Sequence, residues 1–271
     1  MLSKKFADVC QTPSDIYQHL PTLRRYATEC THVTECGVRD AVSSYAFADG
    51  LKGKPNATLV QVDPYLSPAI SVFRNECSEE GLQTIFHQQS DLECPLAETD
   101  LLFIDTWHIY GHLKRELARW HSYVRKYIVL HDTTVDEWYG ESVRMGWDAA
   151  KQSRESGIPV DEIRKGLWPA VVEFLTEHPE WVLFERYTNN NGLTALTRYR
   201  TSESSSASSQ HLSTDHPSSD DTKTEVSLDS SSNLLVQADA SHSDTTLHRS
   251  YNPDEQTLEL EHPISEAQPQ S

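Results

Sequence analysis

Short apolar runs rich in β-branched residues alternate with longer amphipathic segments along the first half of the chain. The short runs predict strands, and the longer segments, with apolar residues three and four positions apart, predict helices. The predicted strands are 32–36, 58–63, 83–87, 100–105 and 127–132, and the predicted helices are 14–29, 41–52, 66–80 and 110–125. Strands that alternate with helices of crossover length predict a parallel, doubly wound α/β sheet.

The pattern changes after the fifth predicted strand. Residues 141–177 indicate two helices broken around 157–159 (Gly-Ile-Pro). Two strand-like runs, 181–188 and 193–199, then flank the sequence Asn-Asn-Asn-Gly at 189–192, which is typical of an antiparallel hairpin. The expected fold is therefore a mostly parallel, seven-stranded Rossmann-like sheet that ends in a hairpin, whereas an NAD-binding domain normally continues with parallel strands.

Composition divides the chain near residue 200. Residues 201–271 contain 18 Ser, no Gly, Cys, Phe or Trp, and 13 acidic against two basic residues. Such a segment buries too little apolar surface to offset the entropy of ordering it, so we expect a disordered acidic tail. Residues 1–200 hold every Trp and Phe and are long enough for one domain with a substantial core.

Charge and cysteine content exclude several classes of function. The tail carries -11 of the formal charge of -18, which leaves -7 on residues 1–200 without a basic run, so nucleic acid is not expected as the main partner. Five cysteines without C-x-x-C spacing indicate reduced buried thiols rather than disulfides or a zinc site. No apolar run has the length of a signal peptide or a membrane span, so a cytoplasmic protein is expected.

The first predicted strand ends in a loop that suits a nucleoside cofactor. Residues 35–44 read E-C-G-V-R-D-A-V-S-S, beginning with the acidic Glu35. Gly37 would allow the backbone to approach a ligand closely, and the following helix start offers its amides and the hydroxyls of Ser43 and Ser44 to a carboxylate. The alternative is an ordinary strand-to-helix turn without a ligand.

Two later strand ends extend this candidate cofactor site. Asp63 ends the second predicted strand, where its carboxylate can accept two hydrogen bonds from a ribose diol. Ser90 and Asp91 follow the third strand and can bind an adenine amino group, although a helix N-cap explains this pair equally well.

Polar residues also follow the fourth and fifth strands, whose carboxyl ends meet at one edge of a doubly wound sheet. Asp105 and Asp132 can hold Mg²⁺ or Mn²⁺ between them with His131 or water, or they can satisfy local amides without a metal. His108 lies one turn past Asp105 and can remove a proton from an acceptor hydroxyl, a task suited to its ordinary pKa of ~6.5. Two further histidines, His112 and His121, are interpreted as surface residues.

These strings together resemble a known group of enzymes over about residues 12–198. They are E-x-G-x-x-x-[G/A]-x-S-[S/T] at 35–44, the strand-end Asp63, D-x-x-H-x-Y at 105–110 and H-D-T at 131–133. The chain resembles the class I S-adenosylmethionine (SAM)-dependent methyltransferases, in the group with cephalosporin hydroxylase-like proteins and macrolide-sugar O-methyltransferases. The resemblance implies SAM as the cofactor and methyl transfer to a hydroxyl on a sugar or small metabolite, with the sulfonium methyl pointing toward Asp105 and His108.

Two positions depart from the pattern of this group. In its metal-dependent members, the resemblance implies metal ligation by the fourth-strand aspartate and an acidic pair after the fifth strand, with the D-x-x-H histidine as base. Here the pair is His131-Asp132, which keeps a ligand but lowers the charge. Ala41 replaces the second glycine of the loop, which should be tolerated if its backbone is helical.

Two functions from other classes remain open at this point. The first is a non-catalytic methyltransferase-fold scaffold that recruits partners through its acidic tail, with apolar clusters at 234–236 and 258–260 as docking points. The second is an NAD-dependent oxidoreductase, which the missing three-glycine fingerprint disfavours. Oligomerisation is compatible with the sequence but is not specified by it.

Overall fold

The computed structural model describes residues 1–199, so the predicted acidic tail lies outside the described residues. Within this range a seven-stranded sheet has the strand order β3-β2-β1-β4-β5-β7-β6. The first five strands are parallel, and β7 is antiparallel to both β5 and β6. The predicted doubly wound, mostly parallel sheet with a terminal hairpin is therefore confirmed.

The strands agree closely with the predicted runs. They are β1 (His32–Cys36), β2 (Thr58–Val62), β3 (Gln83–His87), β4 (Thr99–Ile104), β5 (Val124–His131), β6 (Trp181–Tyr187) and β7 (Leu193–Arg198). The largest difference is that β5 begins three residues before the predicted 127, because the preceding helix ends earlier than expected.

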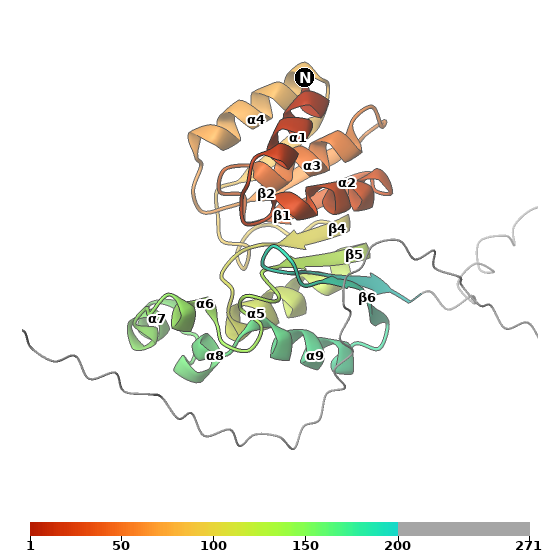
Figure 1. Ribbon diagram of the computed structural model, residues 1–271. Helices are drawn as coiled ribbons and strands as arrows, with labels where there is room; N and C mark the ends of the chain where they lie inside the picture. Colours follow the sequence, from red (N-terminus) through yellow and green to blue (C-terminus); the bar gives the residue numbers. More distant parts are fainter. Residues whose placement is uncertain (200–271) are drawn as a thin grey trace, which may run out of the picture. The chain divides into compact units, whose positions relative to one another are not determined.

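Helices cover both faces of the sheet (Figure 1). One face carries α1 (Leu2–Gln11), the 3₁₀ turn η1 (Tyr17–His19), α2 (Leu20–Thr28), α3 (Val42–Leu51) and α4 (Pro68–Glu79). The other carries α5 (Tyr110–Trp120), η2 (His121–Tyr123), α6 (Glu141–Arg144), α7 (Ala149–Ser156), α8 (Val160–Arg164) and α9 (Leu167–Glu177). Among residues 1–199, no helix has both the length and the apolar character needed to span a membrane.

Three helix predictions need correction. The predicted helix 14–29 starts only at Leu20, after a 3₁₀ turn, and α1 was not anticipated. The region 141–177 forms four helices rather than two. Left-handed backbone at Gly146 and Gly157 interrupts it, and Asp148 starts α7 by accepting hydrogen bonds from two amides of its first turn.

The central strands are buried on both faces, as expected of parallel sheets covered by helices. Along β4 the side chains alternate between two apolar clusters. Leu101 and Phe103 pack in the cluster that includes the α1–α3 layer, whereas Leu102 and Ile104 pack in the one that includes α5 and α9. This rigid centre fixes the strand ends at which the polar residues lie.

Ala41, at the start of α3, does not have the helical backbone assumed from the sequence. Its φ is +60°, in the left-handed region, where a side chain costs about 1–2 kcal/mol. Its methyl group is fully buried, which offsets part of this cost. The glycine that Ala41 replaces would therefore relieve strain at this position.

We expect Ala41→Gly to change the free energy of unfolding by less than about 1 kcal/mol, because relief of left-handed strain offsets the lost methyl burial and the added chain entropy. Ala46, equally buried in the middle of α3, is the matched control. Ala46→Gly should cost about 2 kcal/mol, since helix propensity and burial are both lost there. If urea titrations show equal losses of unfolding free energy for the two variants, the left-handed backbone of Ala41 is contradicted.

Candidate active site

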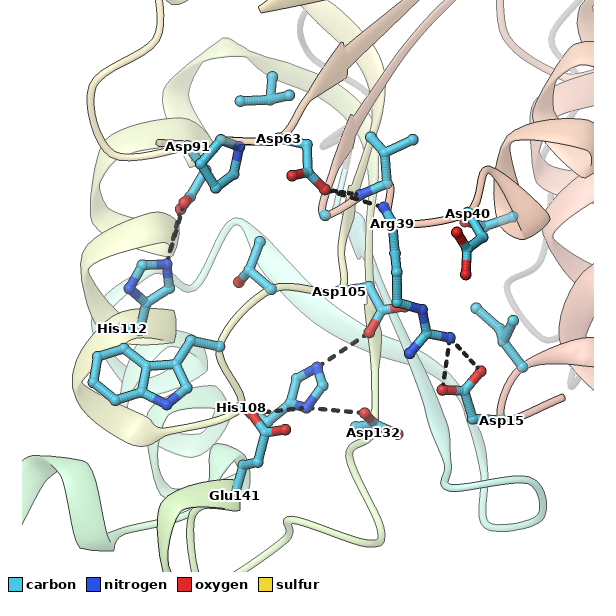
Figure 2. Close-up of a pocket in the computed structure, with 18 of the residues that line it drawn as sticks. Asp15, Arg39, Asp40, Asp63, Asp91, Asp105, His108, His112, Asp132 and Glu141 are labelled. Carbon is cyan, nitrogen blue, oxygen red and sulfur yellow. Dashed lines mark hydrogen bonds and ion pairs between the residues drawn. The ribbon is translucent and has the colours of Figure 1, made fainter. Parts of the chain in front are cut away.

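A pocket of about 500 Å³ opens at the carboxyl ends of the parallel strands (Figure 2). This is where doubly wound sheets bind ligands. Eight of the residues predicted from the sequence line it: Gly37, Ser43, Asp63, Ser90, Asp91, Asp105, His108 and Asp132. The side chains of Glu35 and His131 do not reach this pocket and have other partners.

The fold itself requires a glycine at position 37. Its φ is +84°, and a Cβ at this position would lie 1.9 Å from the carbonyl oxygen of Asp105. The backbones of the β1 and β4 ends also join directly, because the Asp105 amide donates to the Cys36 carbonyl at 2.9 Å. Gly37 therefore closes two strand ends together, and its role in approaching the cofactor stays a prediction.

Glu35 lies beneath the loop instead of in the pocket. Its fully buried carboxylate accepts hydrogen bonds from Ser43 Oγ and Ser44 Oγ, each at 2.6 Å, and from Gln61 Nε2 at 3.2 Å. The two hydroxyls expected to face a ligand carboxylate therefore bind a carboxylate of the protein. Burial raises the pKa of Glu35 to about 7, an effect that these hydrogen bonds oppose without cancelling.

The raised pKa of Glu35 predicts a pH-dependent stability. The folded protein holds the proton more tightly than the unfolded chain, so the contribution is complete below the ordinary pKa of 4.5 and is lost as pH rises through about 7. Compared with the non-titrating Glu35→Gln variant, the wild type should lose roughly 2–3 kcal/mol of unfolding free energy between pH 5 and 8. The prediction is contradicted if the difference in unfolding free energy between wild type and Glu35→Gln stays constant across this range.

Asp63 organises the cofactor side of the pocket. Its Oδ2 accepts from the amides of Val38 at 2.9 Å and Arg39 at 3.0 Å, and its Oδ1 accepts from the Tyr65 amide at 2.8 Å. A carboxylate has about four acceptor positions, so one remains on Oδ1. Asp63 is thus placed for one ribose hydroxyl, while its other bonds hold the loops after β1 and β2 together.

Arg39 and Asp15 form part of the rim, and neither was singled out from the sequence. The Arg39 guanidinium Nη2 donates to both Asp15 oxygens, at 2.9 and 2.8 Å (Figure 2). The pair joins the loop after β1 to the segment between α1 and η1. Both residues line the pocket beside the loop, and the only sequence signal was their charge.

Asp91 takes part in a buried network rather than a simple helix cap. Its Oδ2 lies 3.1 Å from His112 Nε2. His112 was interpreted as a surface residue, but it is buried. One turn further along α5, Glu116 accepts from Thr106 Oγ1 at 2.7 Å. Burial and the nearby Asp91 charge raise the pKa of Glu116 well above its ordinary value. Ser90 lies at the entrance of this network, 3.3 Å from Asp91.

His108 is the centre of the acidic side of the pocket (Figure 2). Its Nε2 lies 3.1 Å from Asp105 Oδ1, and its Nδ1 lies 2.9 Å from Asp132 Oδ2. Asp136 and Glu141 lie beyond Nδ1, at 3.5 and 3.8 Å. These last two residues were missed from the sequence because they lie beyond the end of β5, Asp136 in a turn and Glu141 at the start of α6, and carry no strand-end signal.

The carboxylates around His108 favour a positive charge on its ring. Burial lowers the pKa of His108, but bonds to Asp105, Asp132 and Asp136 outweigh it and raise that pKa well above its ordinary value. Conversely, the pKa of Asp105 is lowered by His131 and His108 despite burial. The pKa of His108 is therefore higher than the ordinary value assumed for a base.

His131 lies behind the cluster. Its Nδ1 is 3.3 Å from Asp105 Oδ1 and its Nε2 is 3.3 Å from the Asn190 carbonyl, so both ring nitrogens are occupied. The structure brings Asp105, His108 and Asp132 together, with ligand atoms within 4.8 Å of one another. His131 Nδ1 also lies 3.5 Å from Asp132 Oδ1, so the set Asp105, His131 and Asp132 stays a prediction. His131 also connects Asp105 to the terminal hairpin.

The charge of the pocket separates the candidate ligands. Seven carboxylate side chains and one guanidinium line it. Such a lining attracts cations and opposes the pyrophosphate of NAD, which binds at backbone amides and positive helix ends. A sulfonium or a divalent cation is therefore favoured over a dinucleotide.

No protein-family model matches the sequence, and no curated protein matches it. The chain is similar to several solved structures. A protein from Corynebacterium glutamicum is 16% identical, with a TM-score of 0.49 over 74% of this chain and 91% of that one. The SAM-bound O-methyltransferase TomG of Streptomyces achromogenes is 12% identical (TM-score 0.48, coverage 72% and 89%). The S-adenosylhomocysteine-bound methyltransferase PaMTH1 of Podospora anserina is 16% identical (TM-score 0.43, coverage 73% and 88%). Similarity at this level leaves the function to be inferred from the residues of the pocket.

Proposed function

We propose that this chain is a SAM-dependent O-methyltransferase of class I that methylates a hydroxyl on a sugar or another small metabolite. One observation carries the proposal. Asp63, at the nucleoside end, and the cluster Asp105–His108–Asp132, at the chemical end, line a single pocket at the carboxyl edge of the sheet. A cofactor held at Asp63 would have its reactive end beside His108.

The hydrogen-bond acceptors and the charge of the cofactor end suit SAM. The remaining acceptor position on Asp63 Oδ1 suits a ribose hydroxyl, and Ser90 and Asp91 lie on the same lining for the adenine. The excess of carboxylates suits a sulfonium ion. Of the predicted cofactor residues, Gly37, Ser43 and Asp105 would border the ligand, while Glu35 would support the loop from beneath.

The cluster also fits Mg²⁺ or Mn²⁺. Asp132 Oδ1 is buried and accepts no hydrogen bond within the described part of the chain. Asp105 and Asp132 supply the carboxylate oxygens that hard divalent cations prefer, and His108 would stay unligated as the base. A metal at this place would increase the acidity of a bound hydroxyl.

The protein's own residues would mainly position the reactants and move one proton. When bound, SAM supplies a methyl group on a positively charged sulfur as the electrophile. Asp105 and Asp132 hold positive charge beside the acceptor, and His108 in its neutral form accepts the hydroxyl proton. Orientation of the acceptor oxygen toward the cofactor supplies much of the rate.

Aromatic residues near the cluster support a ring-shaped acceptor. Trp107 and Trp147 line the pocket together with Glu141, and Trp107 Nε1 is fixed by donating to Ser142 Oγ at 3.3 Å. Flat apolar faces next to a carboxylate suit a ring that carries hydroxyl groups. We therefore infer that the acceptor enters beside α6.

Calorimetric titration of the full chain with SAM, with and without Mg²⁺, tests the proposal. Wild type should bind SAM at micromolar concentration, and Asp63→Ala should lose at least ~30-fold in affinity through loss of a charged hydrogen-bonding group (about 2 kcal/mol). Asp161→Ala, an exposed change on α8, is the matched control and should bind as wild type. A folded wild type that does not bind SAM would overturn the enzyme proposal and favour the scaffold function.

A further inference from the structure

A second group of metal-ligand side chains lies at the opposite edge of the sheet from the pocket. His121 is in η2, immediately before β5, while His178 and Glu180 lie between α9 and β6. Because β5 and β6 both run antiparallel to β7, they start at the same edge, and this is the amino edge, away from the pocket. His121 was interpreted as a surface residue but is half-buried here.

The three side chains already approach the geometry of a tetrahedral metal site. His178 Nδ1 lies 3.5 Å and His121 Nδ1 lies 3.9 Å from Glu180 Oε1. The two imidazole centroids are 4.1 Å apart, and one ligand atom from each residue lies within 4.8 Å of the others. Metal–ligand bonds of about 2.0–2.1 Å place tetrahedral ligands roughly 3.3 Å apart, so only a small closure is needed.

An unpartnered imidazole nitrogen points to a missing ligand. His121 Nδ1 is buried and makes no hydrogen bond to any residue in the range 1–199. Leaving such an atom without a partner is unfavourable, and buried polar groups are seldom left so. The Phe174 ring packs on both imidazoles, with centroids 4.7 Å from His178 and 5.7 Å from His121, and limits their movement.

The charged residues near this group do not prevent a metal ion from binding to it. The Arg198 guanidinium lies nearby, but its Nη2 donates to the His121 backbone carbonyl at 3.0 Å and its Cζ lies over the Trp181 ring. Glu180, with its side chain 42% exposed, is free to turn toward the two imidazoles. Two nitrogens and one oxygen leave a fourth position for water.

We propose that His121, His178 and Glu180 bind a zinc ion, separate from the pocket and independent of the function proposed for it. Imidazole nitrogens favour zinc over magnesium or calcium, which prefer oxygen ligands. The ion would connect the start of β5, the end of α9 and the start of β6. This placement predicts a structural role, because it would hold the terminal hairpin to the helix that precedes it.

Zinc titration of the full chain against a chromogenic chelator tests the site. His178→Asn and Glu180→Gln should each weaken the tightest zinc binding by at least ~100-fold, and both change partly exposed side chains, so folding is not at risk. His32→Asn is the matched control, because its Nδ1 is also buried and unpartnered within the described residues but has no second imidazole beside it in a metal-ligand group. This variant should bind zinc as wild type does.

Two further readouts separate this site from the pocket. Co²⁺ in the wild type should give the strong visible absorption of tetrahedral coordination, and His178→Asn should abolish it. Asp105→Asn, in the pocket, should leave that absorption unchanged. Wild-type zinc affinity in both His178→Asn and Glu180→Gln, or a Co²⁺ spectrum lost in Asp105→Asn but kept in His178→Asn, would overturn the proposal.

Discussion

Replacing Gly37 with alanine is expected to lower the free energy of unfolding by about 3–5 kcal/mol. Two costs combine at this position. The φ of +84° places a side chain in an unfavourable region, and the new Cβ would overlap the Asp105 carbonyl oxygen at 1.9 Å. The new Cβ is fixed by the Gly37 backbone, and the carbonyl oxygen belongs to the Asp105 backbone. Both backbones lie at the ends of buried strands, so neither atom can rotate away. The β1 and β4 ends would have to separate, which should also weaken SAM binding.

Gly53 provides the matched control for this variant. Its φ of +75° is similar, but a Cβ there would meet nothing within 4 Å. Gly53→Ala should therefore cost only the backbone term, about 1 kcal/mol. Urea-induced unfolding of both variants measures the difference directly. If Gly37→Ala lowers the free energy of unfolding no more than Gly53→Ala does, the ends of β1 and β4 are not in rigid contact.

The strand ends were predictable because parallel strands buried on both faces are continuous apolar runs with clear limits. Asp63, Asp105 and Asp132 follow such limits, and the topology alone brings their strands' carboxyl ends to one edge. The terminal hairpin was equally clear, since Asn190 and Asn191 adopt the left-handed backbone that their residue type predicts. The order of elements thus followed from local signals.

The directions of individual side chains did not follow from the same signals. Glu35 and Ser43 are adjacent to a ligand loop in sequence, but the side-chain alternation of β1 points the carboxylate beneath that loop, where Ser43 binds it. His131, next to Asp132, is absent from the pocket lining, and its Nδ1 lies 3.3 Å from Asp105 Oδ1. Alternation in a strand is known in advance, but which face becomes the pocket is decided by tertiary packing.

The limits of α6 to α9 were also beyond local signals. The left-handed glycines Gly146 and Gly157 divide this region, and their effect on chain direction depends on what the short helices cover. Glu141 reaches the His108 cluster only because α6 is turned toward the pocket. Long-range placement of this kind requires the folded structure.

Asp105→Asn should reduce methyl transfer by at least ~10³-fold while leaving SAM affinity within about tenfold of wild type. The single oxygen Asp105 Oδ1 lies 3.1 Å from His108 Nε2 and 3.3 Å from His131 Nδ1, so one atom contacts both histidines. The amide keeps the shape of the side chain but removes the charge that orients His108 and would hold a cation. The cofactor contacts at Asp63 do not involve this oxygen.

Asp100→Asn on the same strand is the matched control for Asp105→Asn. Asp100 is also buried, but near the start of β4, where it accepts from the Thr31 and His32 amides and from Arg125. Its substitution should lower stability by about 2 kcal/mol without changing the rate per folded molecule. Transfer of labelled methyl from SAM to a panel of sugar and phenolic acceptors measures both variants. If Asp105→Asn keeps activity close to wild type, the His108 cluster takes no part in the chemistry. If Asp105→Asn loses methyl-transfer activity and Asp100→Asn keeps it, the cluster acts in catalysis rather than in folding.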